Sequence, residues 1–280
     1  FVLDYFQVPA PQLYTDVSPQ IRDVDIRTVA GVDGEMSLRR AWMTMRDQQI
    51  DTLCVVDGDD RLKGVITVKD VATANMDGLD PHILEKAETS YQNIVEILEG
   101  TVLVGDIRDK QVSGRIIIGS GSAEQIEKSI SPGDIVIVAN RSESQLTAIE
   151  MGAGCVVVCA DSKVSRTIRM LAEEQGCIMI GTPKSTYVAG QMISQAAPIR
   201  HYMTQTDLLT FHLNSPVDAA TKVMASVRFR YFPVLDEAAG AAMKARIAAA
   251  RAGLDSVGGV LETAVLGLEA GHDKHHEARG

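Results

Sequence analysis

The chain carries one apolar pattern twice, and a long unlike segment separates the two copies. When Asp57 is aligned with Asp236, the apolar positions around both residues coincide. The coinciding pairs are Leu38 with Val217, Ala41 with Ala220, Met45 with Met224, Cys54 with Pro233 and Val55 with Val234. A repeat interrupted in this way predicts one kind of domain present twice, with a different domain inserted between its copies.

The first copy predicts the order helix, strand, turn, strand, helix. Apolar residues recur at helical spacing from Leu38 to Met45, whereas Thr52–Val56 is a short apolar strand. Asp57–Asp60 then supplies a hairpin turn into a strand at Gly64, and a second helix starts at Thr67 or Val68.

The segment between the copies alternates short strands with helices. Its strands Ile135–Val138 and Val156–Val158 are apolar on both faces, as parallel strands covered by helices must be. The sequence therefore predicts an α/β domain here. Gly119–Ser122 is either a phosphate-binding loop or a plain turn, and the missing Lys of a P-loop and third Gly of a dinucleotide site favour the turn.

Composition narrows the partners of the chain. It has 280 residues, 45% of them hydrophobic, and a net charge of −10. It can bury ordinary cores but lacks the excess of Lys and Arg on which nucleic-acid binding depends. No apolar run reaches the roughly 18 residues of a membrane span, and no signal peptide is present. We therefore expect a cytoplasmic protein with neither a nucleic-acid nor a membrane partner.

Four cysteines lie in or beside apolar runs, without the paired spacing of metal ligands. They are Cys54, Cys155, Cys159 and Cys177. This placement favours buried free thiols in a reducing cytosol over a metal site or a disulfide. Nothing in the sequence resembles an Asp- and His-rich catalytic metal centre, so we expect no catalytic residue and no metal ligand in this chain.

The stretch Gly64–Asp70 is the candidate ligand site. A strand ends here at the start of a helix, where free backbone N–H groups and the helix dipole favour an anion. Thr67 could then donate its hydroxyl to a phosphate, and Asp70 could accept from both hydroxyls of a ribose. The same Thr-x-x-Asp spacing also resembles a capping box, in which the two side chains satisfy only the helix end.

These features together resemble a CBS, DRTGG, CBS order of domains. The helix-strand-turn-strand-helix units, the strand end Pro233–Asp236 and the turn Gly64–Asp70 resemble CBS domains, and the intervening segment, with Thr182–Tyr187, resembles a DRTGG domain. This order, with Phe1–Phe6 just before it, resembles the regulatory insert of the CBS-containing, manganese-dependent (family II, DHH-type) inorganic pyrophosphatases.

The resemblance implies an α/β fold in which a pair of CBS domains, built of β-α-β-β-α units, carries an inserted DRTGG domain and the second CBS copy is truncated. The implied bounds are residues 1–20 for a lead-in helix and linker, 21–90 for the first CBS domain, 91–197 for the DRTGG-like domain, 198–237 for the partial second CBS domain and 238–280 for an Ala-rich helix and a polar tail of foreign appearance.

In the family that the chain resembles, such an insert binds adenine nucleotides between paired CBS domains and controls the hydrolysis of diphosphate to two phosphates. The positions carried over are Thr67 for the phosphate, Asp70 for the ribose, Lys69 as a nearby cation, and Arg228, Arg230 and Tyr231 as cationic and aromatic groups of the second copy. Arginine suits bidentate phosphate contacts and tyrosine can stack on adenine.

The resemblance also implies the regulatory ligands AMP, ADP, ATP or a diadenosine polyphosphate, Mn²⁺ in the catalytic domain of the parent enzyme, and a homodimer formed through the CBS domains. Without a catalytic motif, the chain by itself is expected not to hydrolyse pyrophosphate. The alternative is a structural or dimerisation module that binds no small ligand.

The second copy departs from the first after Asp236. The repeat places Gly64–Asp70 on residues 243–249, which read Met-Lys-Ala-Arg-Ile-Ala-Ala. We therefore expect the second copy to lack its second strand and its phosphate-facing turn, with an Ala-rich helix over 238–252 in their place. Residues 242–271, which include Asp255-Ser-Val-Gly-Gly-Val-Leu-Glu262, resemble an internal segment of chorismate synthase and indicate a fused sequence.

Overall fold

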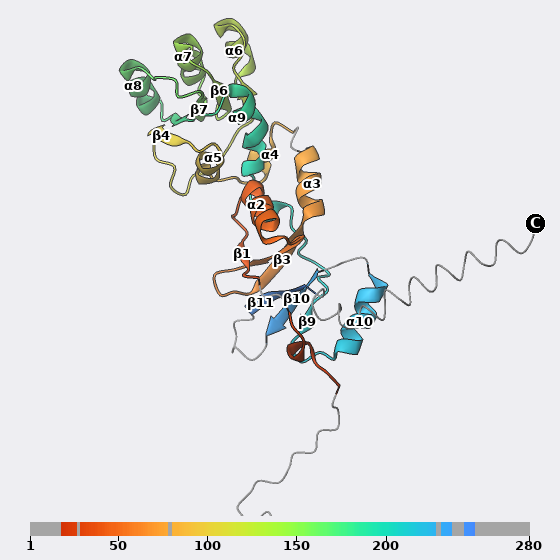
Figure 1. Cartoon of the computed structure of the whole chain (residues 1–280). Coiled ribbons are helices and arrows are strands. Elements are labelled where there is room, and N and C mark those ends of the chain that lie inside the picture. The colour runs from red at the N-terminus through yellow and green to blue at the C-terminus, as the bar shows by residue number, and fades with distance from the viewer. Residues whose placement is uncertain (1–17, 27–28, 78–79, 228–230, 237–243, 250–280) are drawn as a thin grey trace, which may run out of the picture. The chain divides into compact units, whose positions relative to one another are not determined.

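The computed structural model describes residues 18–26, 29–77, 80–227, 231–236 and 244–249 (Figure 1). The packing divides the chain into two compact units. The central unit runs from Gly31 to Leu208, and the terminal unit combines residues up to Ala30 with residues from Leu209 onward.

The central unit begins with a three-stranded sheet. Its strands β1 (Val32–Asp33), β2 (Thr52–Val56) and β3 (Leu62–Thr67) lie in that order, with β1 parallel and β3 antiparallel to β2. Helix α2 (Leu38–Gln48) connects the parallel pair, and α3 (Val68–Asp77) follows β3. The order predicted for the first copy is confirmed.

Local sequence explains where α2 begins and ends. The Ser37 Oγ accepts a hydrogen bond from the Arg40 backbone N–H at 3.3 Å, which satisfies one of the free donors at the helix start. Gln49 ends the helix in the left-handed region, with φ at 54°. The apolar face of α2 is buried through Leu38, Ala41 and Met45.

The rest of the central unit is an α/β domain with a five-stranded sheet. Its elements are α4 (Ile83–Lys86), α5 (Tyr91–Ile97), β4 (Thr101–Val104), β5 (Ile116–Ile118), α6 (Ala123–Ser129), β6 (Ile135–Val138), α7 (Ser142–Glu150), β7 (Cys155–Val158), α8 (Arg166–Glu174), β8 (Ile178–Gly181), α9 (Thr186–Met192) and the 3₁₀ turns η2 (Ile193–Ala196) and η3 (Ile199–His201). The strand order is β4-β8-β7-β6-β5, and only β4 is antiparallel to its neighbour.

Strands β5 to β8 are neighbours in chain order. Right-handed crossovers between such strands place their helices on one face, and α6, α7 and α8 lie side by side there (Figure 1). Helix α9 packs against β6 as well. Both central strands, β6 and β7, are buried along their whole length, which confirms the prediction from their apolar sequences.

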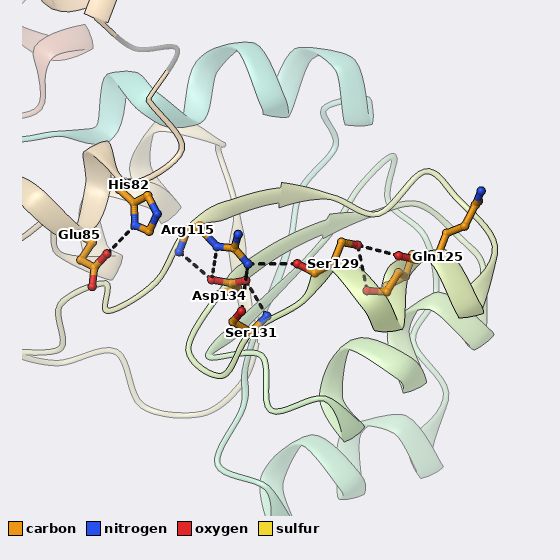
Figure 2. A network of polar contacts seen from close by, with 8 residues as sticks. His82, Glu85, Arg115, Gln125, Ser129, Ser131 and Asp134 are labelled. Atoms are coloured by element: carbon orange, nitrogen blue, oxygen red, sulfur yellow. Dashed lines mark hydrogen bonds and ion pairs between the residues drawn. The ribbon is translucent and has the colours of Figure 1, made fainter.

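A buried carboxylate holds the start of β6 (Figure 2). Asp134 is only 2% exposed and accepts hydrogen bonds from the Arg115 backbone, the Arg115 guanidinium and the Ser131 backbone, each at 2.8–2.9 Å. Burial alone would raise the pKa of Asp134, but these hydrogen bonds outweigh it and hold the pKa below its ordinary value. The same guanidinium donates to the Ser129 carbonyl at 3.1 Å, so one ion pair joins β5, β6 and the end of α6.

The terminal unit repeats the small sheet. Strands β9 (Phe211–His212), β10 (Tyr231–Asp236) and β11 (Lys244–Ala249) form it, with β9 parallel and β11 antiparallel to β10. Helix α10 (Val217–Ser226) connects the parallel pair, and the 3₁₀ turn η1 (Ile21–Asp23) belongs to the same unit. The buried core consists of Ile21, Phe211, Ala220, Phe232 and Val234.

Two expectations about the second copy are wrong. Residues Lys244–Ala249 form a strand instead of part of an Ala-rich helix, so the second copy has the strand that the sequence appeared to lack. The helix preference of alanine is a weak local bias, and pairing along the whole of β10 overrides it. The other residues of the expected helix, 238–243 and 250–252, lie outside the described part of the chain.

The hairpin of the second copy is also longer than the repeat implied. Val55 pairs with Gly64 in the first copy, whereas the equivalent Val234 pairs with Arg246 in the second. The structural counterpart of Thr67 is therefore Ala249 rather than the residue that the sequence offset selects. Neither alignment gives the second copy a hydroxyl at this point.

Candidate functional site

The candidate site lies where β3 passes into α3. The Asp70 Oδ2 accepts hydrogen bonds from the Thr67 backbone N–H at 2.8 Å and from the Thr67 hydroxyl at 2.7 Å. The Thr67 Oγ1 in turn accepts from the Asp70 backbone N–H at 3.3 Å. The two side chains thus form the reciprocal bonds of a capping box, which was one of the two interpretations of their spacing.

The same turn keeps polar groups within reach of solvent. Thr67 and Asp70 are half-buried, and Lys69 between them is exposed. The Val68 N–H donates to the Asp51 carbonyl at 2.9 Å, so the start of α3 is bonded to the residue just before β2. A ligand that approaches the turn meets a cation, a hydroxyl and a carboxylate, the last two of which already bond to each other.

Gly64 marks a second constraint on this strand. The Val65 N–H and carbonyl both bond to the Thr204 backbone at 2.9 Å, so the chain that leaves the α/β domain covers the outer edge of β3. A Cβ on Gly64 would lie 2.7 Å from the Thr204 carbonyl and 2.8 Å from the Met203 sulfur. Glycine is needed here for close approach, a role that the sequence does not reveal.

The predicted binding residues of the second copy stay a prediction. Arg228 and Arg230 lie outside the described residues. Tyr231 is described only as backbone, where it begins β10 and pairs with Ala249. Of the six predicted binding residues, Thr67, Lys69 and Asp70 share one turn, and the binding role of all six stays a prediction.

The cysteines are buried thiols, as expected. Cys54, Cys155, Cys159 and Cys177 are free and buried. Burial raises the pKa of the Cys54 thiol to about 12 and that of Cys177 to about 11. Within the described residues, no group of three or more His, Cys, Asp or Glu side chains is placed to hold a metal ion. No helix of that part of the chain is long and apolar enough to cross a membrane.

Two family models match the chain in the regions just described. The model of the CBS domain matches residues 21–77, and the model of the DRTGG domain matches residues 93–196. The chain contains a CBS domain and a DRTGG domain. The central three-stranded sheet with α2 and α3 lies within the first match, and the five-stranded sheet lies within the second.

The curated relatives that the chain matches are longer proteins. The cobalt-dependent inorganic pyrophosphatase of Clostridium perfringens is 30% identical over 237 residues, which are 85% of this chain and 43% of the relative. A probable manganese-dependent inorganic pyrophosphatase of Thermotoga maritima is 24% identical over 205 residues, which are 73% of this chain and 37% of the relative. The chain therefore spans less than half the length of these relatives.

A solved structure has the same mixed α/β architecture. It contains the CBS and DRTGG domains of the regulatory region of Clostridium perfringens pyrophosphatase, complexed with the activator diadenosine tetraphosphate. It is 29% identical to this chain, matches it with a TM-score of 0.74, and covers 78% of this chain and 95% of its own. The predicted fold class is confirmed. The resemblance of residues 242–271 to chorismate synthase stays a prediction.

Proposed function

We propose that this chain is an adenine-nucleotide-binding regulatory region that controls an inorganic pyrophosphatase and is not catalytic by itself. The observation that carries the proposal is the match, in sequence and fold, to almost the whole of a regulatory region crystallised with diadenosine tetraphosphate. The proposed ligands are AMP, ADP, ATP or a diadenosine polyphosphate. The metal, Mn²⁺ or Co²⁺ in the names of the relatives, would belong to the catalytic part of the parent enzyme.

The geometry of the turn supports a specific binding mode. When the ligand arrives, Thr67 rotates its hydroxyl from Asp70 to a phosphate oxygen, and Asp70 accepts from the ribose hydroxyls while keeping its bond to the Thr67 backbone N–H. Lys69 contributes a nearby positive charge. Arg228, Arg230 and Tyr231 of the second copy complete the site. The existing cap holds Thr67 and Asp70 in position before binding and so reduces the entropy lost on ordering them.

Titration calorimetry with AMP and with diadenosine tetraphosphate tests the proposal. The native chain is expected to bind both, and Asp70→Ala is expected to bind them at least about tenfold more weakly, because it loses a charge-assisted hydrogen bond. Gln125→Ala is the matched control for the cap, since the Gln125 side chain accepts from the Ser122 backbone N–H at the start of α6 as the Asp70 side chain accepts from that of Thr67. Absence of binding by the native chain contradicts the proposal, and so does equal weakening by both variants.

The same region is proposed to form a homodimer through its CBS domains. Trp42 on α2 is 41% exposed and borders a pocket of about 270 Å³, lined mainly by apolar side chains of α2 and α3. Apolar surface of this kind supports association. Sedimentation of the chain with and without AMP measures the oligomeric state.

A structural module without a small ligand is the second candidate. The reciprocal bonds between Thr67 and Asp70 favour it, because they satisfy both side chains without a nucleotide. This candidate predicts that AMP changes neither the oligomeric state nor the urea midpoint of the chain. A phosphate-release assay with pyrophosphate and Mn²⁺ separates both candidates from an enzyme, since neither allows turnover by this chain alone.

A further inference from the structure

The chain that follows the DRTGG domain is bonded to the first CBS domain before it continues to the second copy. We call residues 196–204 the exit segment. Its backbone follows the turn between β1 and α2: the Leu38 N–H donates to the Ala197 carbonyl at 3.0 Å, and the Ile199 N–H donates to the Met36 carbonyl at 2.8 Å. Further on, Thr204 pairs with Val65 through both of its backbone groups, at 2.9 Å each. The exit segment is thus bonded to the turn before α2 and, through Thr204, to the edge of the sheet that carries the candidate site.

Arg200 holds the middle of the exit segment. Its backbone N–H donates to the Gly34 carbonyl at 3.0 Å, and its Nε lies 2.5 Å from the Glu35 carboxylate. The other end of the guanidinium lies 3.3 Å from the Glu88 carboxylate and donates to the Glu88 carbonyl at 3.2 Å. The Arg200 side chain is 27% exposed, whereas its two acidic partners are more than half exposed. One side chain therefore joins the exit segment both to the turn before α2 and to the chain that follows α4.

Asn93 secures the same joint from the DRTGG side. It is a buried residue of α5, and its side-chain amide donates to the Glu35 carbonyl at 2.9 Å and to the Ala196 carbonyl at 3.0 Å. The turn at Glu35 is thereby bonded to Asn93 through its backbone and to Arg200 through its side chain. The start of the exit segment and the turn before α2 cannot separate without breaking these bonds.

We propose that Arg200 is a positioning residue that couples the Thr67–Asp70 turn to the exit segment, and so to the part of the chain that continues into the second CBS copy. This inference rests on the proposed function, because it assumes that a nucleotide binds at the turn. Thr67 lies two residues after Val65 on the same strand, so a ligand that orders the turn also stabilises the Val65–Thr204 pair. Arg200 fixes the segment four residues before Thr204, which keeps Thr204 in place to make that pair.

The coupling is tested by hydrogen exchange of the full chain, measured by mass spectrometry with AMP as the probe. In the native chain, AMP is expected to slow exchange both at the turn and at Thr204, by about fivefold or more at Thr204. In Arg200→Met, AMP still slows exchange at the turn, but its effect at Thr204 is lost. The aliphatic part of the side chain remains, and the exposed partners Glu35 and Glu88 return to water at little cost.

Arg46→Met is the matched control for charge. Arg46 pairs with Asp47 on the surface of α2, at 2.8 Å with both side chains more than half exposed. Removing it changes the net charge equally and so weakens the attraction for an anionic nucleotide in the same way at long range. The response of Thr204 to AMP should survive in this variant. If Arg200→Met also keeps that response, the inference is wrong.

Gly64→Ala gives a second, independent break of the coupling. Its Cβ would press on the Thr204 carbonyl, which is backbone and cannot rotate away. Gly58→Ala is its control, because a Cβ on Gly58 meets nothing within 4 Å. Loss of the Thr204 response in Gly64→Ala alone supports the inference, and an unchanged response in Gly64→Ala overturns it. Failure of the native chain to bind AMP contradicts the proposed function itself, whereas binding with unchanged coupling in the variants contradicts only the role of Arg200.

Discussion

The two small sheets of this chain share one register and differ in chemistry. Val32 pairs with Val55 in the central unit, and Phe211 pairs with Val234 in the terminal unit, at the same offset that aligns the sequence repeat. The parallel half of each sheet is thus reproduced residue for residue. Register depends on which side of a strand is apolar, and that pattern survives in both copies.

The antiparallel half shows what the repeat does not preserve. β11 pairs three positions later than β3, and it presents Arg246 where β3 has Gly64 and Ala249 where β3 has Thr67. A residue with a side chain at the Gly64 position excludes the close approach that Thr204 makes to β3. The first sheet therefore combines a polar turn with a covered edge, and the second has the sequence for neither. The buried apolar residues that form the sheet are alike in the two copies. The copies differ at the few positions, such as those of Gly64 and Thr67, that form the candidate site.

The largest expected effect comes from replacing one equivalent core residue in each sheet, which tests whether the two copies contribute to stability independently. Leu53 and Phe232 occupy the same place in β2 and β10, and both are almost fully buried. Leu53→Ala should lower the free energy of unfolding of the central unit by about 2–5 kcal/mol, and Phe232→Ala that of the terminal unit by about 3–5 kcal/mol. Phe232 packs against Phe211 with ring centroids 5.2 Å apart, within the terminal core.

The single tryptophan of the sequence makes this measurement selective. Trp42 lies on α2, so its fluorescence during urea unfolding follows the central unit. Leu53→Ala should lower the midpoint of that transition, and Phe232→Ala should leave it unchanged. An equal shift in both variants would mean that the two units unfold as one.

Gly64→Arg gives the first sheet the residue that the second sheet has at the equivalent position, Arg246. The added Cβ would meet the Thr204 carbonyl and the Met203 sulfur, so the exit segment must shift or leave the edge of β3. Overpacking of this kind costs about 1–3 kcal/mol. Gly58→Arg, in the open turn between β2 and β3, adds the same side chain and should change stability by no more than about 0.5 kcal/mol. The Trp42 midpoint reports both, and equal midpoints would show that the covered edge of β3 contributes nothing.

The sequence predicted what depends on local pattern. The helix at Leu38, the hairpin at Asp57 and the buried strands β6 and β7 follow from apolar spacing and turn residues, and all are present. The two interpretations of Thr67 and Asp70 were also visible, and the cap is the one that the structure contains. Spacing alone could not choose between them, because a helix start offers the same free N–H groups to a side chain and to a phosphate.

Long-range pairing accounts for what the sequence did not predict. The strand β11 exists because β10 offers it a full ladder, although its own residues favour a helix. Ile21, which the resemblance assigned to the first CBS domain, packs with Phe211 and Phe232 in the terminal core. The joint at Arg200 and Asn93 brings together residues more than a hundred positions apart in the chain, and no periodicity records such contacts.

The smallest expected difference between the two sheets appears at alkaline pH. Cys54 is buried in β2, where burial raises the pKa of its thiol to about 12, and the equivalent residue of β10 is Pro233, which does not titrate. The unfolded thiol ionises near pH 8.5 and the folded one does not, so the unfolded state gains stability as the pH rises past that value. Between about pH 7 and pH 9, Cys54 should therefore lower the free energy of unfolding of the central unit by roughly 0.5–1 kcal/mol.

Urea unfolding followed by Trp42 fluorescence at the two pH values measures this contribution. The loss of stability between the two pH values is compared for the native chain and for Cys54→Ala, and the difference is the part due to Cys54. If the native chain and Cys54→Ala lose the same stability between the two pH values, ionisation of the Cys54 thiol does not contribute to the loss.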